Sequence, residues 1–224
     1  MIQIEKTADG SNTLFVPELD EHYHSIKGAL TESDHIFIKM GLEHCRKQEV
    51  KLLEVGFGTG LNAFLTLLKA EETHKHIYYT TIERYPLDKT TASSLHYPET
   101  IAPDQADTFY KLHEAEWGSP QRITPYFTLL KIKGDFTQHL FDECYDLIYF
   151  DAFAPEKQPE MWNQKLFDYL YSKMNPEGIL TTYCAKGAVR RMLQSAGLTV
   201  ERLPGPPGGK REILRATKLN SKTK

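Results

Sequence analysis

The chain has 224 residues, of which 40% are hydrophobic, and its formal net charge is −3. This length allows one substantial core, and the slightly acidic balance excludes a protein coated in basic surface. Three widely separated cysteines exclude a disulfide framework, no apolar run approaches the roughly 18 residues of a membrane span, and the N-terminus lacks a signal-peptide pattern. We therefore expect a cytoplasmic protein with no membrane partner.

The predicted elements begin with a preface over residues 1–48. Residues 2–5 and 13–16 form a predicted hairpin across Asp9-Gly10, and a helix follows over about 32–46. Residues 49–224 then alternate strand and helix, which predicts an α/β core and a single domain overall. The predicted strands are 51–55, 77–83, 126–133, 145–151, 178–184, 198–203 and 211–217, and the predicted helices lie near 60–70, 87–96, 104–115, 159–174 and 187–196.

The last two of these seven strands are joined by residues 204–209, a segment rich in proline and glycine. It is too short for a crossover helix, so the two strands should form an antiparallel pair at the end of an otherwise parallel sheet.

A glycine-rich turn follows the first core strand, in the run LLEVGFGTGLN at 52–62. A phosphate loop would end in Gly-Lys-Ser/Thr and a dinucleotide fingerprint would be GxGxxG, whereas this spacing is GxGxG with an acidic residue two positions upstream. The pattern is typical of S-adenosylmethionine binding. A glycine turn without a ligand is the alternative, although three spaced glycines cost chain entropy without adding packing. The expected cofactor contacts here are Glu54, Gly56, Phe57, Gly58, Gly60 and Asn62.

Acidic residues end two further strands. Glu83 closes the next strand, where α/β folds that bind nucleosides place a carboxylate on the ribose hydroxyls; a solvated strand-end glutamate is the alternative. Asp135, followed by Phe136, stands at another strand end and resembles the adenine-side acidic position of methyltransferases. We expect both segments to contact the cofactor.

The apolar strand 145–150 ends in Asp151, followed by Ala-Phe-Ala-Pro. Open α/β sheets bind ligands at the carboxyl edge, so Asp151 should point into the site and Phe153 should be available for stacking. A capping aspartate and a core aromatic are the alternatives. The nine histidines are scattered without acidic or cysteine partners at ligand spacing, so we expect no metal site.

Basic residues are concentrated near the C-terminus. Residues 184–224 hold ten Lys and Arg against two Glu, while the remainder holds 17 basic and 28 acidic residues. Such asymmetry is typical of a localised polyanion-binding face, and a solvated tail that includes Lys218, Lys222 and Lys224 explains part of it equally well.

Several segments together resemble the methyltransferase half of the MnmC family. They are VGFGTGLNAFLT, YFDAFAPEKQPEMW, Tyr23-His24-Ser25 in the N-terminal preface, and the run from Gly178 to Glu212. The resemblance covers nearly the whole chain from about residue 20. It departs from the family at Ala152, where glycine is common, and at Lys186, where a small residue is usual.

The resemblance implies a Rossmann-like class I methyltransferase that uses S-adenosylmethionine to methylate the 5-aminomethyl group of wobble (2-thio)uridine in tRNA. Asp151 would orient the acceptor amine and assist loss of its proton. This chain shows no FAD-dependent oxidase domain and no FAD turn, so a separate oxidase is an expected functional partner. Predicted contacts to the tRNA anticodon arm are Tyr23 or Phe153 on the base and Lys186, Arg190, Lys210 and Arg211 on phosphates, with Arg191 more structural.

Two other classes of function remain open from the residues. A methyltransferase or aminopropyltransferase for a small amine would share the fold, and the basic C-terminal third disfavours it. A non-catalytic cofactor- or RNA-binding module would not need Glu54, Glu83, Asp135 and Asp151 together.

Overall fold

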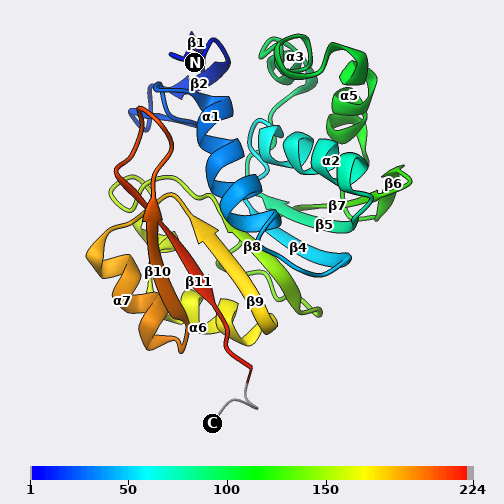
Figure 1. Ribbon diagram of the computed structural model, residues 1–224. Coiled ribbons are helices and arrows are strands. Elements are labelled where there is room, and N and C mark those ends of the chain that lie inside the picture. The colour runs from blue at the N-terminus through cyan, green and yellow to red at the C-terminus, as the bar shows by residue number, and fades with distance from the viewer. Residues whose placement is uncertain (1, 221–224) are drawn as a thin grey trace.

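Within residues 2–220, which a computed structural model describes, the chain forms an eight-stranded sheet in the order β10-β11-β9-β8-β4-β5-β7-β6 (Figure 1). The strands are β4 (Glu49–Val55), β5 (His76–Glu83), β6 (Gln121–Thr124), β7 (Phe127–Lys133), β8 (Tyr145–Phe150), β9 (Met174–Thr182), β10 (Thr199–Pro204) and β11 (Glu212–Thr217). The five strands from β9 to β7 are parallel, whereas β6 and β11 run antiparallel to their neighbours.

The strand order creates a crevice at the middle of the sheet. From β4 the chain moves outward to β5 and β7, and later returns to β8 on the other side of β4. Open α/β sheets bind ligands where the order reverses in this way, outside the carboxyl ends of the strands. All six residues of β8 are buried, as expected for a strand covered on both faces.

Helices cover both faces of the sheet because side chains alternate along each strand. The helical elements of the core are α2 (Leu61–Thr73), α3 (Lys89–Ser93), α4 (Tyr97–Ile101), η2 (Pro103–Gln105), α5 (Ala106–Glu114), η3 (Pro159–Met161), α6 (Gln164–Ser172) and α7 (Gly187–Ser195). In β4, Leu52 packs into one hydrophobic cluster together with α2 and α5, whereas the next residue, Leu53, packs into a second cluster with α6 and α7.

The N-terminal residues form a small sheet and a bent helix. The predicted hairpin is present as β1 (Gln3–Lys6) and β2 (Asn12–Val16), and a short third strand, β3 (Glu21–His22), pairs with β2. The predicted helix is α1 (Ala29–Ser33), which continues as the π-helix η1 (Asp34–Leu42). Its residues Ile36 and Phe37 join the cluster that holds Leu52, so this preface packs onto the core, and the predicted boundary near residue 48 remains a prediction.

The antiparallel pair of β10 and β11 is confirmed. The predicted count of seven strands is wrong by one, because the short strand β6 pairs with β7 at the sheet edge. Its four residues are only partly buried or exposed and lack an apolar alternation, so their pattern predicts no strand there. Along the described part of the chain, no helix is long and apolar enough to cross a membrane, and no group of three metal-binding side chains is present.

Candidate active site

A cavity of about 410 Å³ opens at the carboxyl ends of the central strands, within the size range of small-molecule sites. Its walls come from segments far apart in the sequence: the N-terminal segment 21–26, the turn after β4, the ends of β5, β7 and β8, and the loop between β10 and β11. Of the predicted site residues, the cavity is lined by Tyr23, Gly56, Phe57, Gly58, Asn62, Glu83, Asp135, Phe136, Asp151, Phe153 and Lys210.

The turn between β4 and α2 requires glycine at two positions that line this cavity. Gly56 has a φ of 95°, and a Cβ there would lie 3.2 Å from the backbone oxygen of Asp151. Gly58 has a φ of 49°, and its Cβ would lie 3.0 Å from the ring of Tyr23. The turn is therefore a shallow cradle that side chains would fill. Gly60 instead faces His113, away from the cavity.

Glu54 does not line the cavity, which differs from the prediction that it contacts the cofactor. It is fully buried beneath the turn, where Thr81 Oγ1 donates a hydrogen bond to Glu54 Oε2 at 2.8 Å. Burial raises the pKa of the Glu54 carboxyl well above its usual range. Its position supports the turn from below, and the neighbouring Asn62 reaches the cavity in its place.

Glu83 lies at the end of β5 and braces the glycine turn. The backbone N–H of Gly58 donates to Glu83 Oε2 at 3.1 Å, and that of Tyr85 donates to Oε1 at 2.8 Å. Each carboxylate oxygen can accept a second hydrogen bond, so the group retains acceptors for a pair of hydroxyls. The contact of Glu83 with the ribose remains a prediction.

The acidic residue after β7 is also held in place. Asp135 forms an ion pair with Arg84 Nη1 at 2.9 Å, and Thr137 donates to it through both its side chain and its backbone N–H. These hydrogen bonds, together with Arg84, keep the pKa of Asp135 below its usual value despite the opposing effect of burial. Phe136 is buried beside it, so this end of the cavity combines a carboxylate with an apolar wall.

Asp151 lies immediately after β8, on the opposite side of the glycine turn from Asp135. Asn62 Nδ2 donates to Asp151 Oδ2 at 2.8 Å. Burial raises the pKa of Asp151 to about 7, and the hydrogen bond from Asn62 partly offsets that rise. A carboxyl group with this pKa can accept or release a proton near neutral pH.

Two aromatic rings flank the cavity near Asp151. Tyr23 and Phe153 meet edge to face, with ring centroids 5.2 Å apart, and both line the cavity. The loop that carries Phe153 is fixed by Trp162, whose Nε1 donates to the Phe153 carbonyl at 2.8 Å. Planar groups entering here would meet aromatic faces.

The predicted phosphate-binding residues do not form one group. Lys210 lies at the cavity wall, where its ammonium pairs with Glu32 rather than pointing outward. Lys186 pairs with Glu156 at the surface. No ion pair within residues 2–220 involves Arg190, Arg191 or Arg211. Arg190 is partly buried whereas Arg191 is exposed, so Arg190 is the more structural of the two, the reverse of the expectation. Lys222 and Lys224 lie outside the described residues.

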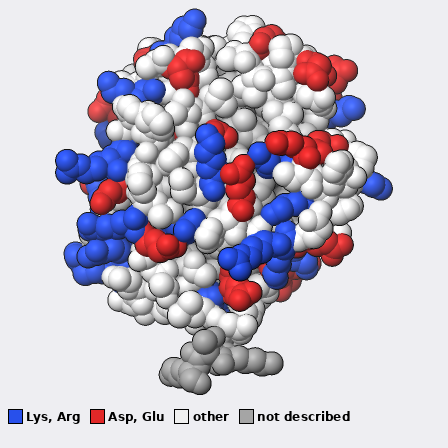
Figure 2. Space-filling model, in the orientation of Figure 1, with Lys and Arg blue, Asp and Glu red and all other residues white. Residues whose placement is uncertain are grey.

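The charge distribution on the surface is correspondingly mixed. Figure 2 shows basic side chains gathered over the part of this face where Figure 1 places α7, with acidic side chains among them. α7 itself carries two arginines and no acidic residue.

The cavity is also lined by residues that the sequence analysis did not select. Among them are His24, Thr59, Glu32 and Tyr183. His24 Nε2 lies 2.7 Å from Thr59 Oγ1, which ties the N-terminal segment to the glycine turn, and burial lowers the pKa of His24 to about 4. His24 and Thr59 are 35 residues apart, so the sequence gives no direct sign of their contact. The polar Tyr-His-Ser run at 23–25 is the only local signal.

The cavity fits S-adenosylmethionine by two features. The glycine cradle allows close backbone approach, and Glu83, at the end of the neighbouring strand β5, offers carboxylate acceptors. The ribose hydroxyls of such a ligand would donate to these acceptors.

A family described as S-adenosyl-L-methionine-dependent methyltransferase matches residues 121–219. The tRNA 5-methylaminomethyl-2-thiouridine biosynthesis bifunctional protein MnmC of Magnetococcus marinus is 33% identical over 220 residues, which cover 93% of this chain and 33% of that protein. The chain thus spans about a third of the length of this curated relative.

Solved structures share the fold. MnmC2 from Aquifex aeolicus superposes with a TM-score of 0.78 at 23% identity, covering 98% of this chain and 71% of that one. Spermidine synthase from Thermotoga maritima superposes with a TM-score of 0.54 at 12% identity, covering 97% and 79%.

The eight-stranded α/β sheet has the Rossmann-like fold of S-adenosylmethionine-dependent methyltransferases, the family whose pattern matches residues 121–219. Over 93% of its length the chain is similar to the MnmC protein of Magnetococcus marinus, of which it spans about a third.

Proposed function

We propose that this chain methylates the amine of the 5-aminomethyl group on uridine or 2-thiouridine at the tRNA wobble position. The observation that carries the proposal is the place of Asp151, in one cavity with the glycine turn and with a pKa of about 7. The sequence relationship to MnmC over 93% of the chain supports this substrate. The product would be the 5-methylaminomethyl nucleoside.

Asp151 would act on the acceptor amine. S-adenosylmethionine supplies a methyl group already activated on sulfur, so the protein must align the amine and keep its lone pair free. The methyl carbon would pass to the amine nitrogen, and sulfur would keep the electrons of the broken carbon–sulfur bond. The proton lost from nitrogen passes to the Asp151 carboxylate, whose Oδ2 is held by Asn62.

The aromatic pair at the mouth would hold the base. An uracil ring turned out of the anticodon loop can stack on Phe153 or Tyr23, as unpaired RNA bases commonly stack on aromatic side chains. Stacking would orient the 5-substituent of the base toward Asp151. It would involve no contact with the oxygen or sulfur at the 2-position.

The anticodon arm would dock along the face that carries α7. Arg190, Arg191 and Arg211 have guanidinium groups without carboxylate partners in the described residues, and Lys186 can exchange its surface partner for a phosphate. Lys210 is not assigned to phosphate binding, because its ammonium already pairs with Glu32.

Incubation of the purified protein with labelled cofactor and defined tRNAs tests the proposal. We expect label in the 5-methylaminomethyl nucleoside from aminomethyl tRNA. We expect none from the carboxymethylaminomethyl form, whose extra carboxylate would meet the carboxylates of Asp151 and Glu32. Label in neither tRNA, or transfer to small polyamines instead, would contradict it. A cell that makes only the carboxymethylaminomethyl form would need an FAD-dependent oxidase, and a separate oxidase partner remains a prediction.

A further inference from the structure

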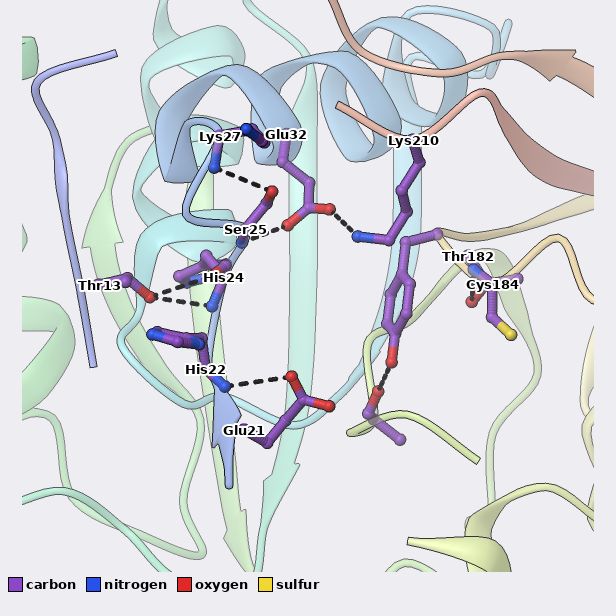
Figure 3. A network of polar contacts seen from close by, with 12 residues as sticks. Thr13, Glu21, His22, His24, Ser25, Lys27, Glu32, Thr182, Cys184 and Lys210 are labelled. Carbon is purple, nitrogen blue, oxygen red and sulfur yellow. Dashed lines mark hydrogen bonds and ion pairs between the residues drawn. The ribbon is translucent and has the colours of Figure 1, made fainter. Parts of the chain in front are cut away.

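An ion pair closes the cavity wall beside Asp151. Glu32 on α1 and Lys210 in the loop between β10 and β11 point toward one another, and their charged groups are in contact (Figure 3). Glu32 is 7% exposed and both residues line the cavity. The pair joins two segments that are 178 residues apart in the sequence.

The second oxygen of Glu32 holds the N-terminal segment. The backbone N–H of Ser25 donates to Glu32 Oε2 at 2.8 Å (Figure 3). Ser25 directly follows Tyr23 and His24, the two residues by which this segment covers the glycine turn. Glu32 therefore contacts both Lys210 and the N-terminal segment that covers the cavity.

Lys210 is held from the other side by Tyr183, which in turn contacts the loop that carries Asp151. Its Nζ lies 4.7 Å from the centroid of the Tyr183 ring, a cation–π contact. The Tyr183 hydroxyl donates to the carbonyl of Ala152 at 2.8 Å, and Ala152 directly follows Asp151. A continuous set of contacts thus runs from Ser25 through the ion pair to the Asp151 loop.

The two members of the ion pair have opposite effects on the charge state of Asp151. Glu32 raises the pKa of Asp151 and Lys210 lowers it. The titratable groups that face Asp151 from the surrounding elements are Glu54 on β4, Tyr79 on β5, Glu32 on α1, Tyr183 after β9 and Lys210 in the β10–β11 loop. Lys210 is the one cation in this set, so its loss would leave the carboxylates uncompensated.

We propose that Glu32 and Lys210 are positioning residues of the methyl-transfer site, which hold the N-terminal segment and the β10–β11 loop around Asp151 and balance each other's charge beside its carboxyl group. The proposal deepens the function proposed above and rests on it for the reaction. Lys210 thereby serves the acceptor geometry from within the cavity, while its neighbour Arg211 stays exposed for a partner.

The charge balance can be tested without any need for activity by carbon-13 NMR of protein labelled at the aspartate carboxyl carbons. The signal that disappears in the Asp151→Asn variant identifies Asp151. Lys210→Met should raise the titration midpoint of Asp151 by roughly 0.5–1 pH unit, and Glu32→Gln should lower it by a similar amount. The double variant should return close to the midpoint of the unaltered protein, because both charges are gone. Shifts in the same direction, or no shift in either single variant, would overturn the proposal.

The rate of tRNA methylation against pH provides the second measurement. The acid limb of this pH–rate profile should move to higher pH for Lys210→Met and to lower pH for Glu32→Gln. For Lys210→Arg it should stay close to that of the unaltered protein. Arg202→Met is the matched control, since Arg202 on β10 pairs with Glu212 on β11 outside the cavity. If the unaltered protein does not methylate tRNA, the proposed function is wrong. The NMR titration would still decide whether Glu32 and Lys210 control the charge of Asp151. If Lys210→Met does not fold, Glu32→Gln and the double variant still carry the comparison.

Discussion

The side-chain amide of Asn62 donates to Asp151 Oδ2 at 2.8 Å, which joins the helix that follows the glycine turn to the loop after β8. The amide N–H stabilises the ionised carboxylate, while burial favours the protonated form. Asn62 also lines the cavity. It is thus placed beside the proposed cofactor site and fixes the group that we propose to handle the acceptor proton.

Replacing Asn62 with leucine should shift the pH dependence of methyl transfer. Without its donor, Asp151 lacks the hydrogen bond that favours the charged form, so its pKa rises and the carboxylate is available only at higher pH. The acid limb of the rate profile should move up by roughly 1 pH unit. Single-turnover rates between pH 5.5 and 8.5 measure this; an unmoved limb with full activity would show that the hydrogen bond does not control Asp151.

Valine at Gly58 should abolish most cofactor binding. The position has a φ of 49°, and a branched side chain would collide with Tyr23 and fill the cradle. Calorimetry should give an affinity for S-adenosylmethionine at least about tenfold weaker. Gly118→Val is the matched control, because Gly118 also has positive φ but no atom within 4 Å of an added Cβ. Equal losses in both variants would attribute the effect to backbone strain rather than to the cradle.

Alanine at Glu83 should weaken the same binding by roughly 1–3 kcal/mol, the usual range for removal of charge-assisted hydrogen bonds. The substitution removes the proposed ribose acceptors and also frees the N–H groups of Gly58 and Tyr85. Glu143→Ala, at an exposed glutamate, should leave affinity unchanged. Titration with S-adenosylhomocysteine provides the measurement, and a Glu83→Ala protein that binds as tightly as the parent would remove Glu83 from the site.

Most strand positions and the cavity wall could be predicted because they follow from local patterns. An apolar run ending in an acidic residue marks a buried strand that delivers a side chain to the carboxyl edge, which placed Glu83, Asp135 and Asp151 correctly on the cavity wall. Glu54 follows the same pattern, but it precedes the end of its strand by one residue, so its side chain is buried beneath the turn.

Long-range pairing had no signal in the sequence. Lys210 looks like any loop lysine until the fold brings it to Glu32, and charge counting therefore assigned it to RNA. Strand β6 was missed for a related reason, because its pairing with β7, rather than its own composition, makes it a strand.

Removing the arginines of α7 should weaken tRNA binding without affecting the cofactor. Arg190→Ala combined with Arg191→Ala should reduce the salt slope of tRNA affinity by roughly 0.7–0.9 for each phosphate that the protein no longer neutralises. Arg122→Ala on β6, at the opposite edge of the sheet, is the control. A slope that matches the parent in the α7 variant would place the docking face elsewhere on the molecule.

The most direct test of the account is the rate of a single turnover by Asp151→Asn on aminomethyl tRNA, with cofactor and enzyme saturating. Asparagine preserves the shape of the side chain but cannot take the proton, so methyl transfer should fall about 10²- to 10⁴-fold, while affinity for S-adenosylmethionine changes little. A rate within a few-fold of the unaltered protein would contradict the central claim that Asp151 accepts the proton of the acceptor amine.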